Sequence, residues 1–178
     1  NTLYMYVKNG DRSLHFKAIK IDVYGPADLR QLSISSGANL YIEPSISSAN
    51  ITANISAAGS LKAKLKAENI HINASSSGNF KGEIISSSLG VNCSSTAKIN
   101  ATGSAKEANI NASSASKIEM QQLHMENATI DASSTASVKI HVSGKLKASA
   151  SSNACVAYAG KPETTDFNYS ANGRIQKL

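Results

Sequence analysis

Lysine and asparagine side chains return at one fixed interval along this chain of 178 residues. Two lysine pairs are each separated by 19 positions: Lys62 with Lys81, and Lys98 with Lys117. Rows of lysines can attract an anionic surface or polymer, although like charges also serve solubility. Four asparagines share the interval: Asn54, Asn73, Asn92 and Asn111. Rows of amides can hydrogen-bond to one another, which is a structural role, or meet hydroxyl-rich ligands such as glycans.

Groups that could perform catalysis or hold a metal do not converge in the same way. The four histidines fall at four different positions of the repeat: His15, His71, His124 and His141. No pair of them has the spacing of zinc ligands. Glu107 and Glu126 come closest to an acid/base pair, five and six residues before Ala112 and Ala132. Calcium-binding repeats, phosphate-binding glycine loops and nucleophile elbows are absent from the sequence. We therefore predict no catalytic residue, no metal site and no cofactor.

The interval of about 19 residues belongs to a structural repeat that must position these side chains. Each unit has a small or aliphatic residue, a short Ser/Ala-rich stretch, and a larger apolar residue six positions after the first. Seven pairs follow this rule: Ile34/Leu40, Ile55/Leu61, Ala74/Phe80, Cys93/Ile99, Ala112/Ile118, Ala132/Val138 and Ala150/Val156. The steps between their first members are 21, 19, 19, 19, 20 and 18 residues. Such regularity indicates stacked units.

Hydrophobic residues within each unit alternate with period 2, which indicates strands and not helices. The inward positions are expected to be these: Ile51/Ala53/Ile55, Ile70/Ile72/Ala74, Leu89/Val91/Cys93, Ala108/Ile110/Ala112, Ala128/Ile130/Ala132 and Leu146/Ala148/Ala150. Two strands per turn are expected, together with a third, less regular one. The sequence therefore predicts an all-β fold, a single-stranded parallel β-helix (solenoid) with turns of about 19 residues. Parallel crossovers are nearly always right-handed, so the coil is expected to be right-handed.

The domain organisation follows from the repeat. We expect one β-helix domain over residues 1–178, with a strand pair or cap at 1–31, seven regular turns at 32–160 and a closing segment at 161–178. The two cysteines fall in different positions, Cys93 inward and Cys155 outward, about 14 Å apart at ~4.8 Å per stacked strand. This separation exceeds the reach of a disulfide, so two free thiols are expected.

The formal net charge of +6 raises the question of an anionic partner. Nucleic acid is not expected, because the column of Lys62 and Lys81 continues as Asn100 and Glu119 and lacks interleaved aromatic residues. No run of 18 apolar residues occurs, and no basic-then-apolar leader opens the sequence, so we expect neither a transmembrane helix nor a signal segment within it.

Several segments resemble a known bacterial family. They are Lys20 to Asn39 (KIDVYGPADLRQLSISSGAN), the Ser-Ser-x-Gly/Ala turns, the segment from Tyr158 to Pro162 (YAGKP) and the segment from Ser170 to Gly173 (SANG). In their order they resemble the autotransporter-adhesin head domain, also called the GIN domain. The resemblance covers nearly the whole chain and implies a β-helix that is secreted or held at the cell envelope of a Gram-negative bacterium. It implies no catalytic or ligand residue.

Together these observations favour a non-enzymatic adhesin or binding module of the cell envelope or extracellular space. Glycans or envelope polymers are the expected partners, and the lysine and asparagine rows are the candidate binding residues. Two alternatives remain open at this point. A self-assembling scaffold would need exposed apolar end turns, and a carbohydrate-active enzyme would need acids clustered on neighbouring turns. The sequence does not define an oligomeric state.

Overall fold

Residues 28–178 are described by the computed structural model, and in this range the chain forms strands and turns but no helix. No helix that could span a membrane therefore occurs in these residues. The strand pair predicted for residues 1–31 falls mostly on residues 1–27, which lie outside the described part of the chain. The strands are β1 (Gln31–Ile34), β2 (Asn39–Tyr41), β3 (Ile46–Ile55), β4 (Ser60–Ala74), β5 (Asn79–Cys93), β6 (Lys98–Ala112), β7 (Lys117–Ala132), β8 (Ser137–Val142), β9 (Lys145–Ala150), β10 (Cys155–Ala159), β11 (Thr164–Tyr169) and β12 (Arg174–Lys177).

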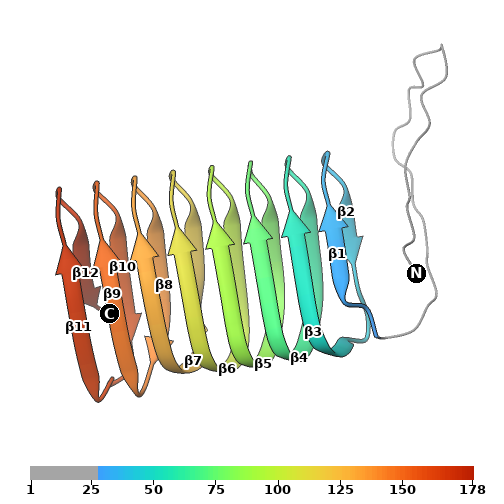
Figure 1. The fold of residues 1–178 in the computed structure, drawn as a ribbon. Coiled ribbons are helices and arrows are strands. Elements are labelled where there is room, and N and C mark those ends of the chain that lie inside the picture. The colour runs from blue at the N-terminus through green and yellow to red at the C-terminus, as the bar shows by residue number, and fades with distance from the viewer. Residues whose placement is uncertain (1–27) are drawn as a thin grey trace, which may run out of the picture.

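These strands stack coil upon coil into a parallel β-solenoid (Figure 1). All the strand pairs within residues 28–178 are parallel, and residues about 19 positions apart are hydrogen-bonded neighbours, such as Leu61 with Phe80 and Phe80 with Ile99. In Figure 1 the near strands run upward and the far strands downward while the chain advances from right to left, which is a right-handed coil. The predicted fold class is confirmed.

Each coil has two faces joined by a bend and a tight turn. In β4, residues 60–65 run along one face, the chain bends at 66–69, and residues 70–74 return along the opposite face (Figure 1). A separate third strand does not form, because β4, β5 and β6 each continue through the bend as one strand of 15 residues. The backbone at the bend keeps its hydrogen bonds to neighbouring coils, as in the pairing of Lys66 with Ile85. Each coil therefore contributes one run of residues to each face.

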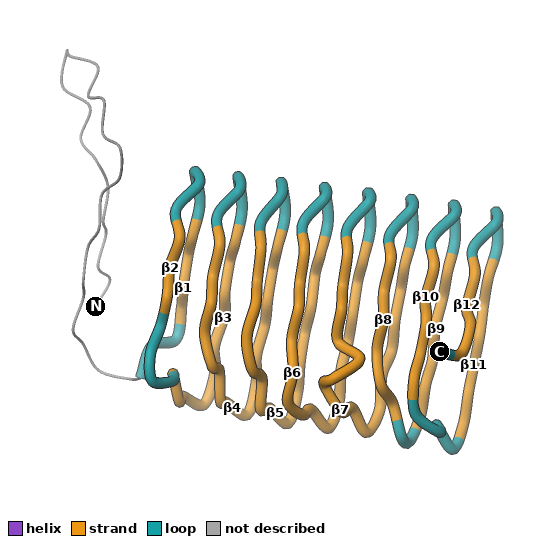
Figure 2. Tube along the Cα trace, turned by 180° about the vertical axis from the view of Figure 1, so that it is seen from behind, coloured by secondary structure: helices purple, strands orange, loops and turns teal. Residues whose placement is uncertain are grey.

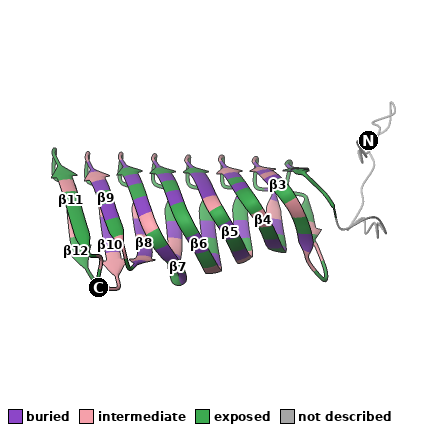
Figure 3. Cartoon of the chain, turned by 60° about the horizontal axis from the view of Figure 1, so that its bottom comes forward, coloured by how far each residue is buried: buried purple, intermediate pink, exposed green. Residues whose placement is uncertain are grey.

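The core lies between the two faces and runs the length of the stack. Buried and exposed positions alternate along the strands (Figure 3), and all the predicted inward residues are buried. Leu40 is an exception among the seven repeat pairs, because it lies in the short strand β2 of the first coil and is only half-buried. Small residues such as Ala74 and Cys93 precede the tight turns, as the sequence predicted.

The tight turns use backbone conformations that most residues avoid. In the turn after Ala74, the central residues Ser76 and Ser77 have φ of 47° and 62°, and the Gly78 N–H donates to the Ser75 carbonyl at 2.8 Å. Positive φ at both central residues is the type I′ turn, and the left-handed region costs an L-residue about 1–2 kcal/mol. The next turn offsets this cost, because the Ser77 N–H donates to the Ser95 carbonyl at 3.0 Å. Eight such turns stack in the described chain, one more than the predicted seven, since residues 161–178 add β11 and β12 in register.

One coil departs from the regular repeat. Its strand β7 is 16 residues long and kinks where it leaves the register of its neighbours (Figure 2). Register shifts occur between β6 and β7 and between β7 and β8, and at no other described pair. In the second shift, Met120 pairs with Ile140 but His124 pairs with His141, so residues 121–123 have no partner in β8 and β7 forms a β-bulge there. Toward β6 the bulge amounts to one extra residue, because Gln122 and Leu123 still pair with Thr102 and Gly103.

Candidate functional site

The predicted binding residues fall on two opposite faces of the solenoid. We call the face formed by residues 51–55, 70–74, 89–93, 108–112 and their equivalents the asparagine face, because Asn54, Asn73, Asn92 and Asn111 project from it. We call the face formed by residues 60–65, 79–84, 98–103 and their equivalents the lysine face, because it carries Lys62, Lys81, Lys98 and Lys117. Within each row the side chains lie on neighbouring coils of one face, but the two rows do not meet at one site.

The asparagine row is a continuous hydrogen-bonded ladder. The Nδ2 of Asn73 donates to the Oδ1 of Asn54 at 2.9 Å, that of Asn92 to Asn73 at 2.8 Å, and that of Asn111 to Asn92 at 3.0 Å. Each central amide thus donates one hydrogen bond and accepts another from the next coil. An amide that is satisfied in this way has less capacity left for a ligand.

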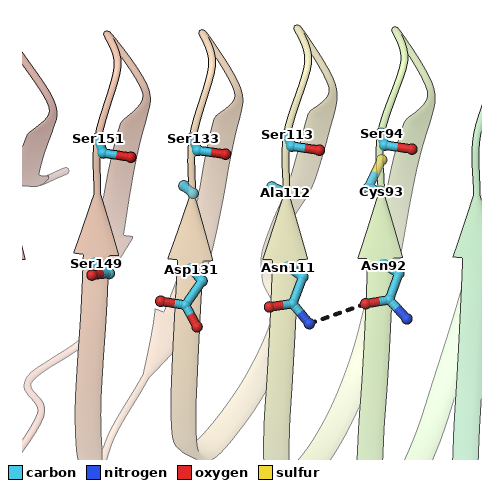
Figure 4. Close-up of a pocket in the computed structure, with 11 residues that line it drawn as sticks. Asn92, Cys93, Ser94, Asn111, Ala112, Ser113, Asp131, Ser133, Ser149 and Ser151 are labelled. Atoms are coloured by element: carbon cyan, nitrogen blue, oxygen red, sulfur yellow. Dashed lines mark hydrogen bonds between the residues drawn. The ribbon is translucent and has the colours of Figure 1, made fainter. Parts of the chain in front are cut away.

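A shallow hollow of about 350 Å³ lies where the ladder ends (Figure 4). One side of it continues the amide row as Asp131 and Ser149, and these two side chains make no hydrogen bond to a described residue. The other side is a row of serines that follow the small inward residues: Ser94, Ser113, Ser133 and Ser151. The hollow is rich in oxygen atoms and carries a single charged side chain.

The lysine face is built differently, because its outward side chains form scattered pairs and no continuous ladder. Lys62 and Lys81 are register neighbours, and so are Lys98 and Lys117, as the repeat predicted. Lys117 forms an ion pair with Glu119, with 2.8 Å between Nζ and Oε1. The Lys117 hydrogen bond, together with the charges of nearby lysines, holds the pKa of the Glu119 carboxyl below its usual value. Lys81 and Lys98 are exposed and form no ion pair with any described residue.

A wide groove of about 780 Å³ opens on the lysine face beside the first coils. Its position follows from β2, which is only three residues long, so the chain leaves the face at Ile42 and forms a wall with Glu43 and Pro44. The other lining residues include Tyr41, Lys62, Lys64, Lys81, Glu83, Asn100 and Thr102. We call this feature the Tyr41 groove.

The aromatic ring in this groove was missed by the sequence analysis. Tyr41 is the register neighbour of Lys62 in the preceding coil, and its side chain is 56% exposed. The Lys62 ammonium lies 4.6 Å from the ring centroid and donates to the Tyr41 hydroxyl at 3.1 Å. The signal was available, because Tyr41 precedes Lys62 by 21 residues, which is the first step of the repeat.

The β-bulge overturns one interpretation of the histidines. The regular repeat placed His124 and His141 in different positions, but the extra residues of β7 bring them opposite each other. Their Nδ1 atoms lie 3.1 Å apart, and the rings meet edge to face with 4.4 Å between centroids. Burial lowers the pKa of His141, and the neighbouring His124 lowers it further. The steps of 20 and then 18 residues in the repeat were the signal of this irregularity.

The proposed pairing of Glu107 with Glu126 does not form. Asn127 is the register partner of Glu107, and its Nδ2 donates to the Glu107 Oε1 at 2.7 Å. Among residues 28–178 there is no group of three or more His, Cys, Asp or Glu side chains placed to hold a metal ion.

Both cysteines are free thiols, as predicted, and they lie in different environments. Cys93 is buried in the core beneath the asparagine face, and burial raises its pKa to about 11 against a smaller opposing effect of Ser116. Cys155 is half-buried on the lysine face, two coils beyond Lys117 in the same column.

A protein-family model described as "Putative auto-transporter adhesin, head GIN domain" matches residues 1–162 of the chain. No curated protein matches the chain. The matched range includes both lysine pairs, the asparagine ladder, the Tyr41 groove and the histidine pair.

Proposed function

Because the chain belongs to the auto-transporter adhesin head GIN domain family, we propose that it is a non-enzymatic binding module of the cell envelope or the extracellular space. The family description supports an adhesin head domain, and the solenoid supplies long flat faces on which repeated weak contacts can add up.

The lysine face is the proposed binding surface, and anionic glycans or envelope polymers are its proposed ligands. The Tyr41 groove is the observation that carries this assignment. It places an exposed aromatic ring beside three lysines and the hydrogen-bonding side chains of Asn100 and Thr102. A tyrosine ring offers a rigid apolar surface to the C–H face of a sugar ring, and its hydroxyl remains polar. Exposed ammonium groups attract carboxylate or phosphate substituents along the polymer.

Lys98 and Lys117 lie on adjacent coils and extend the same surface beyond the groove. Lys98 is exposed and has no ionic partner among the described residues, whereas Lys117 is held by Glu119. We infer that Lys98 contributes more than Lys117 to attraction of a polyanion, because the Glu119 carboxylate already offsets the charge of Lys117.

The asparagine row has a structural role in this proposal. Its amides are hydrogen-bonded from coil to coil, so each central amide has only its second N–H and its second lone pair left for a glycan. Asn54, Asn73, Asn92 and Asn111 therefore hold adjacent coils together, and the oxygen-lined hollow beyond Asn111 carries the side chains that continue their row and are unpaired among residues 28–178.

A binding assay with oligogalacturonate as the anionic probe and dextran fragments as the neutral probe tests the proposal. We expect wild-type protein to bind the anionic probe and to lose affinity as salt rises, because screening weakens exposed charge interactions within a Debye length of about 8 Å at physiological ionic strength. The double substitution Lys62→Gln/Lys81→Gln should weaken binding and flatten its salt dependence. Reversing the charge of Lys98 and Lys117 together should weaken it more than either change alone.

The matched control is Lys145→Gln/Lys147→Gln, which removes the same charge from exposed positions of β9 on the asparagine face. It should bind like the wild type. Tyr41→Ala should lower affinity at every salt concentration without changing the salt slope, because stacking is not screened. Equal losses in the two double-lysine variants would show only a global charge effect and contradict a localised site.

A self-assembling scaffold is the second candidate, and the last coil favours it. Strands β11 and β12 form the last coil within residues 28–178, where they are the edge of the sheet, and Tyr169 and Leu178 there are 63% and 59% exposed. Such an edge can pair with another sheet edge. Ordered end-to-end fibres in electron micrographs, lost in Tyr169→Lys, would favour the scaffold. Depolymerisation of a polysaccharide, abolished by Glu107→Gln, would instead favour a carbohydrate-active enzyme.

A further inference from the structure

We propose that His124 and His141 form a two-imidazole binding site for a divalent first-row transition-metal ion such as Ni²⁺, Cu²⁺ or Zn²⁺. The site lies at the bulge of β7, apart from the Tyr41 groove and from the asparagine ladder, and the proposal does not depend on the function proposed above.

The distance between the two rings fits shared coordination of one ion. Histidine nitrogens bind zinc at about 2.0–2.1 Å. With bonds of that length and 3.1 Å between the Nδ1 atoms, the angle at the ion is about 98°. This lies between the right angle of tetragonal sites and the wider angle of tetrahedral ones, so the pair can serve either geometry.

The protonation states also suit a metal. At 3.1 Å the two Nδ1 atoms share a hydrogen bond, so one carries a proton and the other presents a lone pair. When an ion replaces that proton, the donor ring keeps its neutral form by carrying its proton on Nε2 instead. Two neutral imidazoles then face the ion through Nδ1, and the exchange needs no net release of protons.

The β-bulge of β7 is the backbone feature that brings the two histidines together. The bulge is the place where the register of the described coils breaks, and it aligns two histidines that a regular repeat would separate. Bulges often re-aim side chains next to functional sites. His124 is exposed and His141 is half-buried, so one ring is anchored while solvent and ions still reach the pair.

The two imidazoles suit a metal ion of intermediate softness and leave some of its coordination positions unfilled. The described chain offers no third His, Cys, Asp or Glu side chain there, so water or a group from another molecule completes the coordination. Imidazole ligands select Cu²⁺, Ni²⁺ and Zn²⁺, whereas Mg²⁺ and Ca²⁺ prefer oxygen. We therefore expect the order Cu²⁺ above Ni²⁺ and Zn²⁺, with no binding of Mg²⁺ or Ca²⁺ at this site.

Calorimetric titration of the full chain with NiCl₂ and ZnCl₂ tests the site. We expect one ion per chain in the wild type. His124→Gln and His141→Gln should each weaken binding by more than the roughly ten- to hundredfold that loss of an outer-shell partner costs, because each removes a direct ligand. The matched control is His15→Gln/His71→Gln, which removes the other two histidines and should leave binding unchanged. Cys155→Ser should also leave it unchanged, which excludes the half-buried thiol as the ligand.

An NMR titration of wild-type protein keeps the test independent of whether the variants fold. Zn²⁺ should shift the Nδ1 resonances of His124 and His141 together and leave His71 unaffected. Absence of binding to the wild type, or binding that survives both His124→Gln and His141→Gln, would overturn the proposal. Zinc-induced shifts confined to other histidines would overturn it as well.

Discussion

The asparagine face and the lysine face are built on the same coils and the same core, but their outward polar groups are satisfied in different ways. Along the asparagine face, amides stacked in register hydrogen-bond to the amide of the next coil. Along the lysine face, stacked ammonium groups repel one another and rely on scattered glutamates and solvent. Stacking in register therefore lets asparagines hydrogen-bond to the equivalent asparagines of neighbouring coils. Lysines stacked in the same way cannot form such bonds to one another. The second kind of row is available to a partner.

Charge introduced beneath either face should have the largest effect on stability, and the effect should be equal on both. Ile110 under the asparagine face and Ile99 under the lysine face are each 1% exposed. We expect Ile110→Asp and Ile99→Asp each to lower the free energy of unfolding by more than about 4 kcal/mol, because each buries an unpaired charge. Urea denaturation measures the change. The exposed controls Asn109→Asp and Asn100→Asp should stay within about 0.5 kcal/mol of the wild type; losses as large as those of the core variants would mean that the register is wrong.

The reactivities of the two cysteines allow the core beneath the asparagine face to be compared with the surface of the lysine face. Cys93, whose pKa burial raises to about 11, should react with a thiol reagent at least roughly a hundredfold more slowly than Cys155 in the native state at pH 8, because only the thiolate attacks. Mass spectrometry after timed labelling measures both rates, and unfolding should make them equal. Fast native labelling of Cys93 would contradict its place in the core.

Breaking the amide ladder should cost less than breaking the core but more than removing a lysine. Asn92→Ala removes the hydrogen bonds to Asn73 at 2.8 Å and Asn111 at 3.0 Å, and each is worth about 0.5–1.5 kcal/mol net. We expect a loss of about 1–3 kcal/mol in the free energy of unfolding. Lys81→Ala and Asn109→Ala, whose side chains make no hydrogen bond to a described residue, should change it by less than about 0.5 kcal/mol. If Asn92→Ala resembles Asn109→Ala, the ladder contributes nothing to stability.

The ion pair between Lys117 and Glu119 should give the smallest effect. The hydrogen bond from Lys117 lowers the folded-state pKa of Glu119, so the pair stabilises the fold above the unfolded-state pKa and its contribution is lost as pH falls through the folded-state value. Carboxyl-carbon NMR should therefore show a titration midpoint below the ordinary value of about 4.3, and Lys117→Ala should raise it. An unchanged midpoint in Lys117→Ala would show that the ion pair does not persist in solution.

Much of the fold was predictable because the repeat constrains every coil in the same way. The spacing of Ala74 and Phe80, repeated in seven units, was sufficient to place the inward residues and the stacking partners of the lysines and asparagines. Period-2 alternation could not show that the two rows lie on opposite faces, because this depends on the tight turn between residues 74 and 79. The first member of each pair ends one face and the second begins the other.

The irregular features of the candidate sites were harder to predict, since they arise where the repeat fails. Tyr41 borders a groove because β2 ends after three residues, and nothing in the repeat specifies where a strand is cut short. His124 and His141 meet because β7 holds extra residues, which the spacing shows only as a step of 20 residues followed by one of 18. Leu123 and Met125 are both buried beyond the irregularity, whereas Gln121 and Gln122 are two consecutive exposed residues, and period-2 alternation does not predict such a break.

The central claim is that the lysine face binds an anionic polymer while the asparagine face holds the coils together. Amide chemical-shift mapping with an oligogalacturonate probe tests this claim most directly, because it locates the contact without any substitution. We predict that shifts concentrate on Tyr41, Lys62, Lys81 and Asn100, with little change at Asn73 and Asn92. Shifts concentrated on the asparagine ladder and the hollow beyond it would contradict the claim and assign binding to the opposite face.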